Sequence, residues 1–220
     1  MRVATLVIAL STLSHFGIAQ EAGSKPIVPG LPSSFHWRND PAGWKVSDGV
    51  LTIRSSGKTD WYAAPTGGAV VGSSPLLLFP APRDFWFSAK VTLYFKSQFD
   101  AGALIVYADE QNWVKFAFES PNGKSGGVVS VVTRGLSDDN TGTAIEGNSD
   151  YLKISKTGQA IFLHFSTNGR TRSVTRAFNL GPERPLQFGL SSQSPNGTET
   201  AATFSEIRFK PEALKPWSGE

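Results

Sequence analysis

Residues Phe85–Phe95 read FWFSAKVTLYF, and this stretch decides the fold class. Every second side chain in it, from Phe85 to Phe95, is apolar, and the side chains between them include Ser88, Lys90 and Thr92. Successive side chains of a strand point to opposite faces of a sheet, so a period of two predicts a strand with one core face and one wet face. No stretch of the chain shows a convincing helical spacing of apolar residues.

Further strand-like segments follow along the chain. Gly102–Ala108 is apolar at nearly every position, which predicts a central strand covered on both faces. Trp113–Glu119 alternates again, and Thr203–Lys210 has its period broken between Phe204 and Ile207, which predicts a β-bulge. The remaining predicted strands are Val128–Arg134, Leu152–Lys156, Ile161–Ser166, Arg170–Phe178 and Leu186–Leu190.

Turn dipeptides separate these segments at Asp48-Gly49, Asn122-Gly123, Asn168-Gly169 and Asn196-Gly197. Asn, Asp and Gly tolerate the positive φ that tight hairpin turns require. About a dozen short strands in one domain bury the apolar faces of their sheets best when two sheets stack against each other. The sequence therefore predicts an all-β fold, a two-sheet antiparallel jelly-roll sandwich.

The first nineteen residues have the pattern of a signal peptide. Arg2 gives a positive start, Val3–Leu13 is apolar but too short to span a bilayer, and residues 17–19 offer small side chains for cleavage after Ala19. We expect a secreted or periplasmic chain with no membrane span. Its expected divisions are residues 1–19 as signal peptide, 20–34 as flexible leader, 35–210 as sandwich domain and 211–220 as C-terminal tail.

Composition excludes several classes of function. The 220 residues contain no Cys, which excludes disulfides, thiolate metal sites and cysteine nucleophiles. Only His36 and His164 remain after the expected cleavage, so a zinc site built on His is not expected. The net charge of +3 is spread without a basic run, so a nucleic-acid partner is not expected either.

Several short motifs recur in a fixed order along the chain. They are Phe35-His-Trp37 with Trp44 and Leu51, Thr59-Asp60-Trp61, Phe99 to Leu104, Asp109 to Lys115 with Glu119, and Val129 to Val132 followed by Ser137-Asp138. In this order they resemble a concanavalin A-like family of uncharacterised domains that includes the fungal regulation-of-enolase protein. The resemblance covers roughly residues 35–209 and is most specific between Asp100 and Asp138.

The resemblance implies a concanavalin A-like sandwich and little about chemistry, because fold alone does not supply function. The chain also departs from the family pattern. Members usually read Asp-Gln-Ala-Gly where this chain has Asp100-Ala101-Gly102, and Ser-Asp-Trp where it has Ser137-Asp138-Asp139. Any ligand contact that the Gln and Trp make in relatives is lost or replaced here.

A carbohydrate-binding groove is the favoured functional prediction. Flat aromatic rings stack on the apolar face of a pyranose, and neighbouring charged or amide groups bond its hydroxyls. The alternative is that the rings pack in a second core layer and the charges form a salt-bridged surface. The predicted ligand-binding residues are Asp60, Trp61, Asp100, Trp113, Lys115, Glu119, Arg134 and Asp138. Glu119 and Arg134 share a surface if their two strands pair as a hairpin.

Other functions remain open from the sequence. A glycoside hydrolase or lyase needs two suitably placed carboxyl groups, yet the Glu-x-Asp-x-Glu string of glucanases with this fold is absent. A serine triad has no Gly-x-Ser-x-Gly motif to support it. A protein-interaction domain is the third alternative. No cofactor is predicted, although the loop expected at Asp138-Asp139-Asn140 offers oxygen ligands for a structural Ca²⁺.

Overall fold

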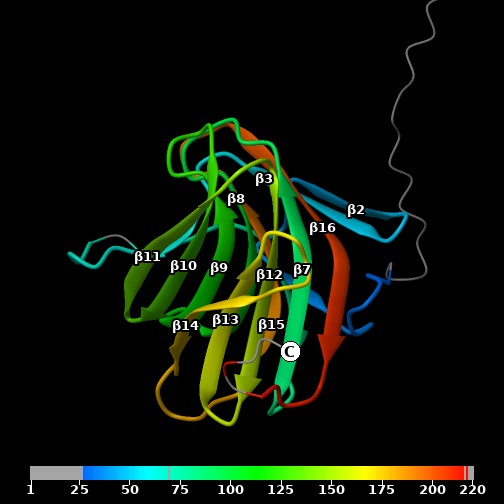
Figure 1. Ribbon diagram of the computed structural model, residues 1–220. Coiled ribbons are helices and arrows are strands. Elements are labelled where there is room, and N and C mark those ends of the chain that lie inside the picture. The colour runs from blue at the N-terminus through cyan, green and yellow to red at the C-terminus, as the bar shows by residue number, and fades with distance from the viewer. Residues whose placement is uncertain (1–26, 69, 216, 218–220) are drawn as a thin grey trace, which may run out of the picture.

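Two seven-stranded antiparallel sheets stack to form the molecule (Figure 1). The computed structural model describes residues 27–68, 70–215 and 217. Sheet A contains, in spatial order, β1 (His36–Arg38), β6 (Leu76–Pro80), β15 (Gln187–Gln193), β8 (Ala101–Asp109), β9 (Asn112–Glu119), β10 (Gly126–Arg134) and β11 (Leu136–Ile145). Sheet B contains β14 (Ser173–Phe178), β13 (Ala160–Ser166), β12 (Ser149–Thr157), β7 (Phe85–Leu93), β16 (Glu199–Lys210), β3 (Val50–Ser56) and β2 (Gly43–Ser47). The predicted two-sheet sandwich is confirmed.

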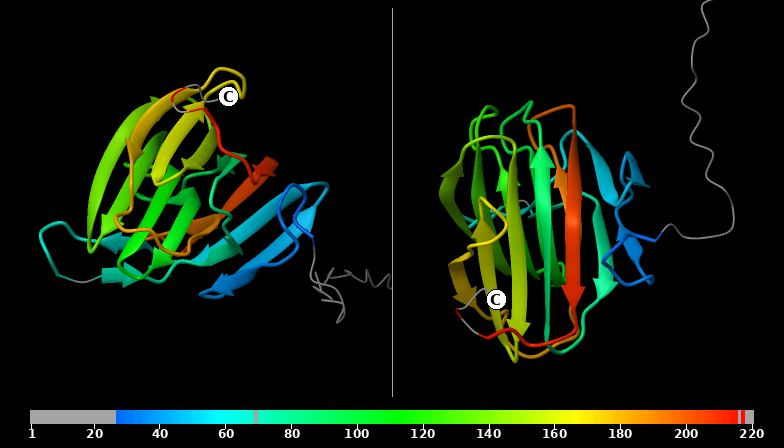
Figure 2. Two further views of the ribbon diagram at one scale, coloured as in Figure 1. Left: turned by 90° about the horizontal axis from the view of Figure 1, so that it is seen from below. Right: turned by 45° about the vertical axis from the view of Figure 1, so that its right-hand side comes forward.

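The main core lies between the two sheets, and β7 supplies its central stripe in sheet B. Phe85, Phe87, Ala89, Val91 and Leu93 are at most 1% exposed, as their alternation predicts. Figure 2 shows the two layers from below and sheet B from its outer side. Each fully buried large apolar side chain contributes about 1.5–3 kcal/mol relative to an exposed one, so this interface dominates the stability.

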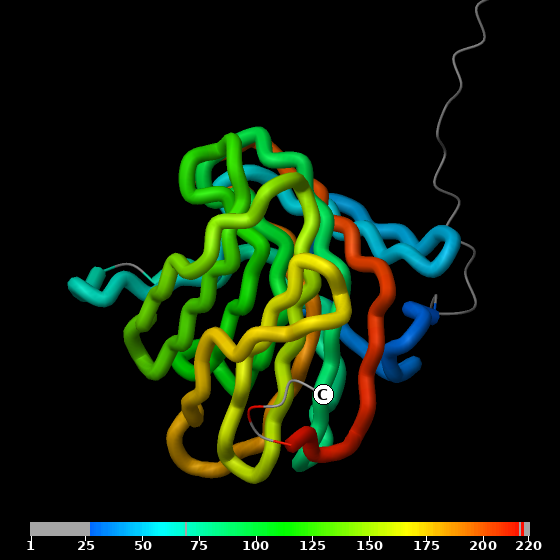
Figure 3. Tube along the Cα trace, viewed as in Figure 1, coloured from blue at the N-terminus to red at the C-terminus, as the bar shows by residue number. Residues whose placement is uncertain are grey.

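A second apolar layer covers the outer face of sheet A. It is built by a short hairpin, β4 (Trp61–Ala63) and β5 (Val70–Gly72), which lies against β8, β9 and β10. The predicted double burial of Gly102–Ala108 is confirmed, because its two faces pack against two different apolar clusters. The tube in Figure 3 shows the β4–β5 loop projecting past the β11 edge. The sequence did not predict this hairpin.

The turn chemistry agrees with the sequence in most places. Asp48 and Gly49 both have positive φ, 51° and 77°, and join β2 to β3 as a two-residue turn. The β16 bulge is confirmed, because its register against β7 shifts between Ser205 and Arg208. The expectation fails at Asn196-Gly197, where neither residue has positive φ.

Packing against the sandwich extends beyond the expected domain limits at both ends. Val28, in the segment expected to be a leader, is 1% exposed and belongs to the main core. Leu214, in the expected tail, is 9% exposed, and its carbonyl accepts a hydrogen bond from Thr157 Oγ1 at 3.0 Å. The expected signal peptide lies outside the described residues. Among those that are described, no helix is long and apolar enough to cross a membrane.

Candidate functional site

Charged side chains occupy the outer face of sheet A beside the apolar layer. Lys115 and Glu119 lie on β9 with the same orientation, because they are four residues apart on a strand. Lys115 stands between Ile105 and Val131 on the neighbouring strands, and Glu119 stands next to Ala101. Both charged side chains are nearly buried, with 3% and 7% of the residue surface exposed. A buried charge is costly unless it is paired, so its partners define the site.

Asp60 and Gln193 converge on Lys115 from segments far apart in the sequence. Lys115 Nζ lies 2.9 Å from Asp60 Oδ1 and donates to Gln193 Oε1 at 3.0 Å. Glu119 Oε2 lies 3.8 Å from the same ammonium and accepts a hydrogen bond from Gln193 Nε2 at 3.4 Å. We call these four residues, together with Asp139, the Lys115 cluster. The lysine is shared between two carboxyl groups and an amide oxygen, and the nearer carboxyl is Asp60.

The cluster shifts the ionisation of its own members. Burial raises the pKa of Glu119 from 4.5 to about 7, although the charge of Lys115 opposes this rise. Burial alone would lower the pKa of Lys115, but the charges of Asp60 and Glu119 outweigh it, and the lysine pKa lies above its ordinary value. Partial burial also raises the pKa of Asp139. Near neutral pH, Glu119 therefore exchanges a proton while Lys115 stays charged.

The strand register, rather than the motif, selects which acidic residue of β11 joins the cluster. Asp139 pairs with Val131, which faces outward, whereas Asp138 pairs with Val132, which belongs to the main core. Asp138 instead forms an ion pair with Arg176 of β14 at 2.5 Å. The sequence prediction named Asp138 and missed Asp139. Residues 138–140 form part of an edge strand, so the expected Ca²⁺ loop is not there, and the side chains of Asp138 and Asp139 diverge.

Three other predicted ligand residues have structural roles. Trp61 and Trp113 are 3% and 1% exposed and pack edge to face at 5.8 Å in the second apolar layer. The Trp61 indole N–H donates to the Ser74 carbonyl at 2.8 Å. Asp100 is fully buried, and its carboxylate accepts hydrogen bonds from two backbone N–H groups and from the Ser194 hydroxyl. None of these three side chains is open to a ligand.

Arg134 also lies outside the cluster. It follows the phase of Val128 and Val132 on β10, which is opposite to that of Val131, so it occupies the other face of sheet A. Its guanidinium donates to the Asn179 carbonyl at 3.3 Å. β9 and β10 do pair as the predicted hairpin, but Glu119 stands opposite Gly127 and Arg134 opposite Asn112. Glu119 and Arg134 therefore do not meet.

Gln193 is the cluster member that no sequence signal indicated. It comes from the end of β15, where it pairs with Ala101, and it is 2% exposed. Besides its bonds to Lys115 and Glu119, its amide donates to the Phe99 carbonyl at 3.3 Å. A single Gln at a strand end carries no motif. Only the antiparallel order β15-β8-β9 brings it beside the lysine.

The cluster can act as a polar recognition surface. The Asp60 side chain is 21% exposed and Asp139 lies at the surface, so carboxylate oxygens face the solvent while the ammonium lies beneath them. Such oxygens accept hydrogen bonds from hydroxyl and amine groups. The described residues contain no group of three or more acidic or His side chains placed to hold a metal ion.

The fold and this site define a two-sheet antiparallel β-sandwich with a polar cluster on the outer face of sheet A. Residues 37–212 match the family described as "Protein of unknown function (DUF1349)", and the chain belongs to that family. This confirms the resemblance that the sequence motifs indicated.

Individual relatives agree with this assignment. Regulation of enolase protein 1 of Saccharomyces cerevisiae is 23% identical over 173 residues, which cover 77% of this chain and 86% of that protein. A crystal structure of a functionally unknown protein from Saccharomyces cerevisiae has a TM-score of 0.75 at 21% identity, covering 82% of this chain and 97% of the other.

The GH43 protein BlXynB from Bacillus licheniformis is also similar, with a TM-score of 0.66 at 13% identity. The similarity covers 83% of this chain but 37% of BlXynB, so the sandwich corresponds to about a third of that longer protein. At such low identity the likeness shows the shared fold and nothing about the activity.

Proposed function

We propose that this protein is a non-catalytic carbohydrate-binding domain and that the Lys115 cluster forms the floor of its binding surface. The observation that carries the proposal is a nearly buried ammonium shared by Asp60, Glu119 and Gln193 on the outer face of a sheet, with Asp139 exposed beside it. A structural ion pair needs one partner, whereas this arrangement keeps spare carboxylate oxygens at the surface. Those oxygens suit the hydroxyl groups of a neutral saccharide.

The comparisons support this proposal at the level of the fold. Several solved structures of similar shape are described as GH43 glycoside hydrolases or as a xylan β-1,4-xylosidase, and this chain corresponds to roughly a third of each. The occurrence of this fold within proteins so described motivates the choice of a saccharide as the proposed ligand, while the site itself is argued from the Lys115 cluster. The proposed location is the periplasm or the exterior, because the residues expected to form a signal peptide precede the domain.

Asp139→Asn tests the site, and Asp138→Asn is its matched control. Both aspartates lie on β11 at the surface, but only Asp139 faces the Lys115 cluster. On a glycan array followed by calorimetric titration with the best hit, we expect Asp139→Asn to weaken binding by about tenfold, which is roughly 1.4 kcal/mol. We expect Asp138→Asn to bind like the wild type. Equal affinities for both variants would move the site away from the cluster.

A blank array would contradict carbohydrate binding and favour a protein partner, as the relative that regulates enolase suggests by its description. Catalysis is the second candidate, because a carboxyl with a pKa of about 7 lies near another acidic group. Release of reducing ends from a bound polysaccharide, abolished by Glu119→Gln, would establish a hydrolase. Absence of release with retained binding would establish the non-catalytic role.

A further inference from the structure

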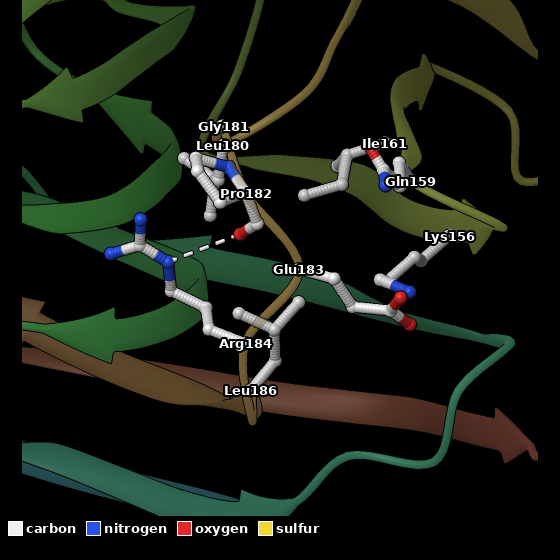
Figure 4. A pocket seen from close by; sticks show the side chains of 9 residues that line it. All are labelled: Lys156, Gln159, Ile161, Leu180, Gly181, Pro182, Glu183, Arg184 and Leu186. Atoms are coloured by element: carbon white, nitrogen blue, oxygen red, sulfur yellow. Dashed lines mark hydrogen bonds between the residues drawn. The ribbon is translucent and has the colours of Figure 1, made fainter.

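A separate groove lies at the end of the sandwich, away from the Lys115 cluster. Three connections meet there, namely β6 to β7, β12 to β13 and β14 to β15. The larger part of the groove has a volume of about 400 Å³. Figure 4 shows the side chains of the smaller adjoining part, which has a volume of about 30 Å³ and has Leu180 and Ile161 in its apolar lining. Lys156, Glu183 and Leu186 line both parts.

Lys156 has two carbonyl acceptors but no ion-pair partner among the described residues. The residue is 9% exposed, and its ammonium donates to the carbonyl oxygens of Arg83 at 2.6 Å and Gly158 at 2.5 Å. An ammonium has three N–H groups, so these two acceptors leave one donor unused. No carboxylate oxygen of the described residues lies within 4.0 Å of Lys156 Nζ, so the ammonium forms no ion pair with them. Burying a charge without a counter-ion is unfavourable, and a bound anion would relieve that cost.

The other charges of the groove leave it open to an anion. Arg184 is already paired with Asp109 at 2.9 Å, and its Nε donates to the Pro182 carbonyl at 3.3 Å. Arg83 is exposed on the groove wall and forms no ion pair with a described residue. Glu183 is exposed on the β14–β15 connection, farther from Lys156 than an ion pair allows. Among the residues that line the groove, two cations without an ion-pair partner therefore face one solvated carboxylate, while the neighbouring Asp84 carboxylate already accepts a hydrogen bond from the Gly158 N–H at 2.7 Å.

We propose that this groove binds a small organic anion, with a carboxylate or a similar oxyanion at Lys156 and an apolar portion against Leu180 and Leu186. The apolar wall distinguishes such a ligand from a bare inorganic ion. This inference is independent of carbohydrate binding at the Lys115 cluster, because the two sites share no residue.

The test is an NMR titration of the full chain with butyrate and with butyramide, its neutral isostere, at fixed ionic strength. We expect saturable shifts of the Gly158 and Gly181 amides with butyrate and none with butyramide. Parallel titrations with phosphate and sulfate identify which oxyanion fits best. An equal response to butyramide would overturn the proposal.

Two variants keep the proposal falsifiable. Lys156→Met keeps the aliphatic stem, removes the charge, and should weaken butyrate binding by about tenfold or more. Glu183→Gln removes the carboxylate that lines the groove and should tighten binding by about threefold, and this exposed position is not expected to affect folding. Glu146→Gln, an exposed change in the β11–β12 connection, is the control. Unchanged affinity in Lys156→Met, or weaker binding in Glu183→Gln, would contradict the assignment.

Discussion

Glu119 shows how a single residue changes character when the fold surrounds it. In an unfolded chain its pKa is 4.5, and in the folded protein burial raises that pKa to about 7. The folded protein therefore holds this proton more tightly than the unfolded chain between those two values. The stability from Glu119 is fully present below pH 4.5 and is lost as the pH rises through 7.

The matching prediction compares Glu119→Gln with the wild type by urea unfolding at pH 5 and pH 8. Gln cannot ionise, so the variant escapes the cost of a buried carboxylate at pH 8. We expect the free energy of unfolding of the wild type, relative to the variant, to fall by on the order of 1–3 kcal/mol between these pH values. Other titrating groups, such as Asp150 and His164, are the same in both proteins and cancel. A pH-independent difference would contradict the raised pKa.

Residue-level predictability was limited by strand phase. The sequence placed Lys115, Glu119 and Asp60 in one predicted site, and the structure brings these three side chains together. It selected Asp138 in place of Asp139, since one residue of phase moves a side chain to the opposite face. That phase depends on the β10–β11 register, which the polar sequence of β11 does not reveal.

At the scale of elements, the strongly alternating strands were predictable and the covering hairpin was not. β7, β8 and β9 were located from their own apolar pattern. The strands β4 and β5 have three residues each, too few to show a period. The sequence therefore left open which ring faces a ligand and which lies under another layer, and Trp61 and Trp113 are buried for that reason.

Trp61 is the large buried side chain that anchors the β4–β5 hairpin to sheet A. Trp61 packs edge to face with Trp113 and with Tyr107, and its indole is anchored to Ser74. We expect Trp61→Ala to lower the free energy of unfolding by about 3–5 kcal/mol, because it removes a large buried ring. Tyr94→Ala, at a position 75% exposed, should change it by less than about 0.5 kcal/mol. Urea unfolding of both variants measures the difference, and a small loss at Trp61 would mean that the hairpin is dispensable.

At the scale of the whole molecule, the domain begins earlier than the apolar pattern suggests. Residues 27–34 contain no strand-like alternation, yet Val28 enters the main core. Gly30 has a positive φ of 81°, and a Cβ there would lie 2.2 Å from the Ile207 carbonyl oxygen. The N-terminal segment therefore packs closely against the bulged part of β16.

Val28→Ala and its neighbour Ile27→Ala test this boundary in the full chain. Val28 is 1% exposed and Ile27 is 68% exposed, so the two truncations remove similar atoms from very different surroundings. We expect Val28→Ala to lower the free energy of unfolding by about 1–2 kcal/mol and Ile27→Ala to have almost no effect. Thermal unfolding measures both, and equal effects would place this segment outside the cooperative domain.

The double covering of β8 and β9 also determines how long their backbone stays closed to water. These strands lie inside sheet A, with the main core on one side and the hairpin layer on the other. Their amide protons can exchange with deuterium only when both coverings have opened. The amides of β8 and β9 should therefore be the last in the protein to take up deuterium. The amides of the edge strands β2 and β14 should be among the first to exchange. The order of exchange times would therefore follow the depth of each strand in the molecule.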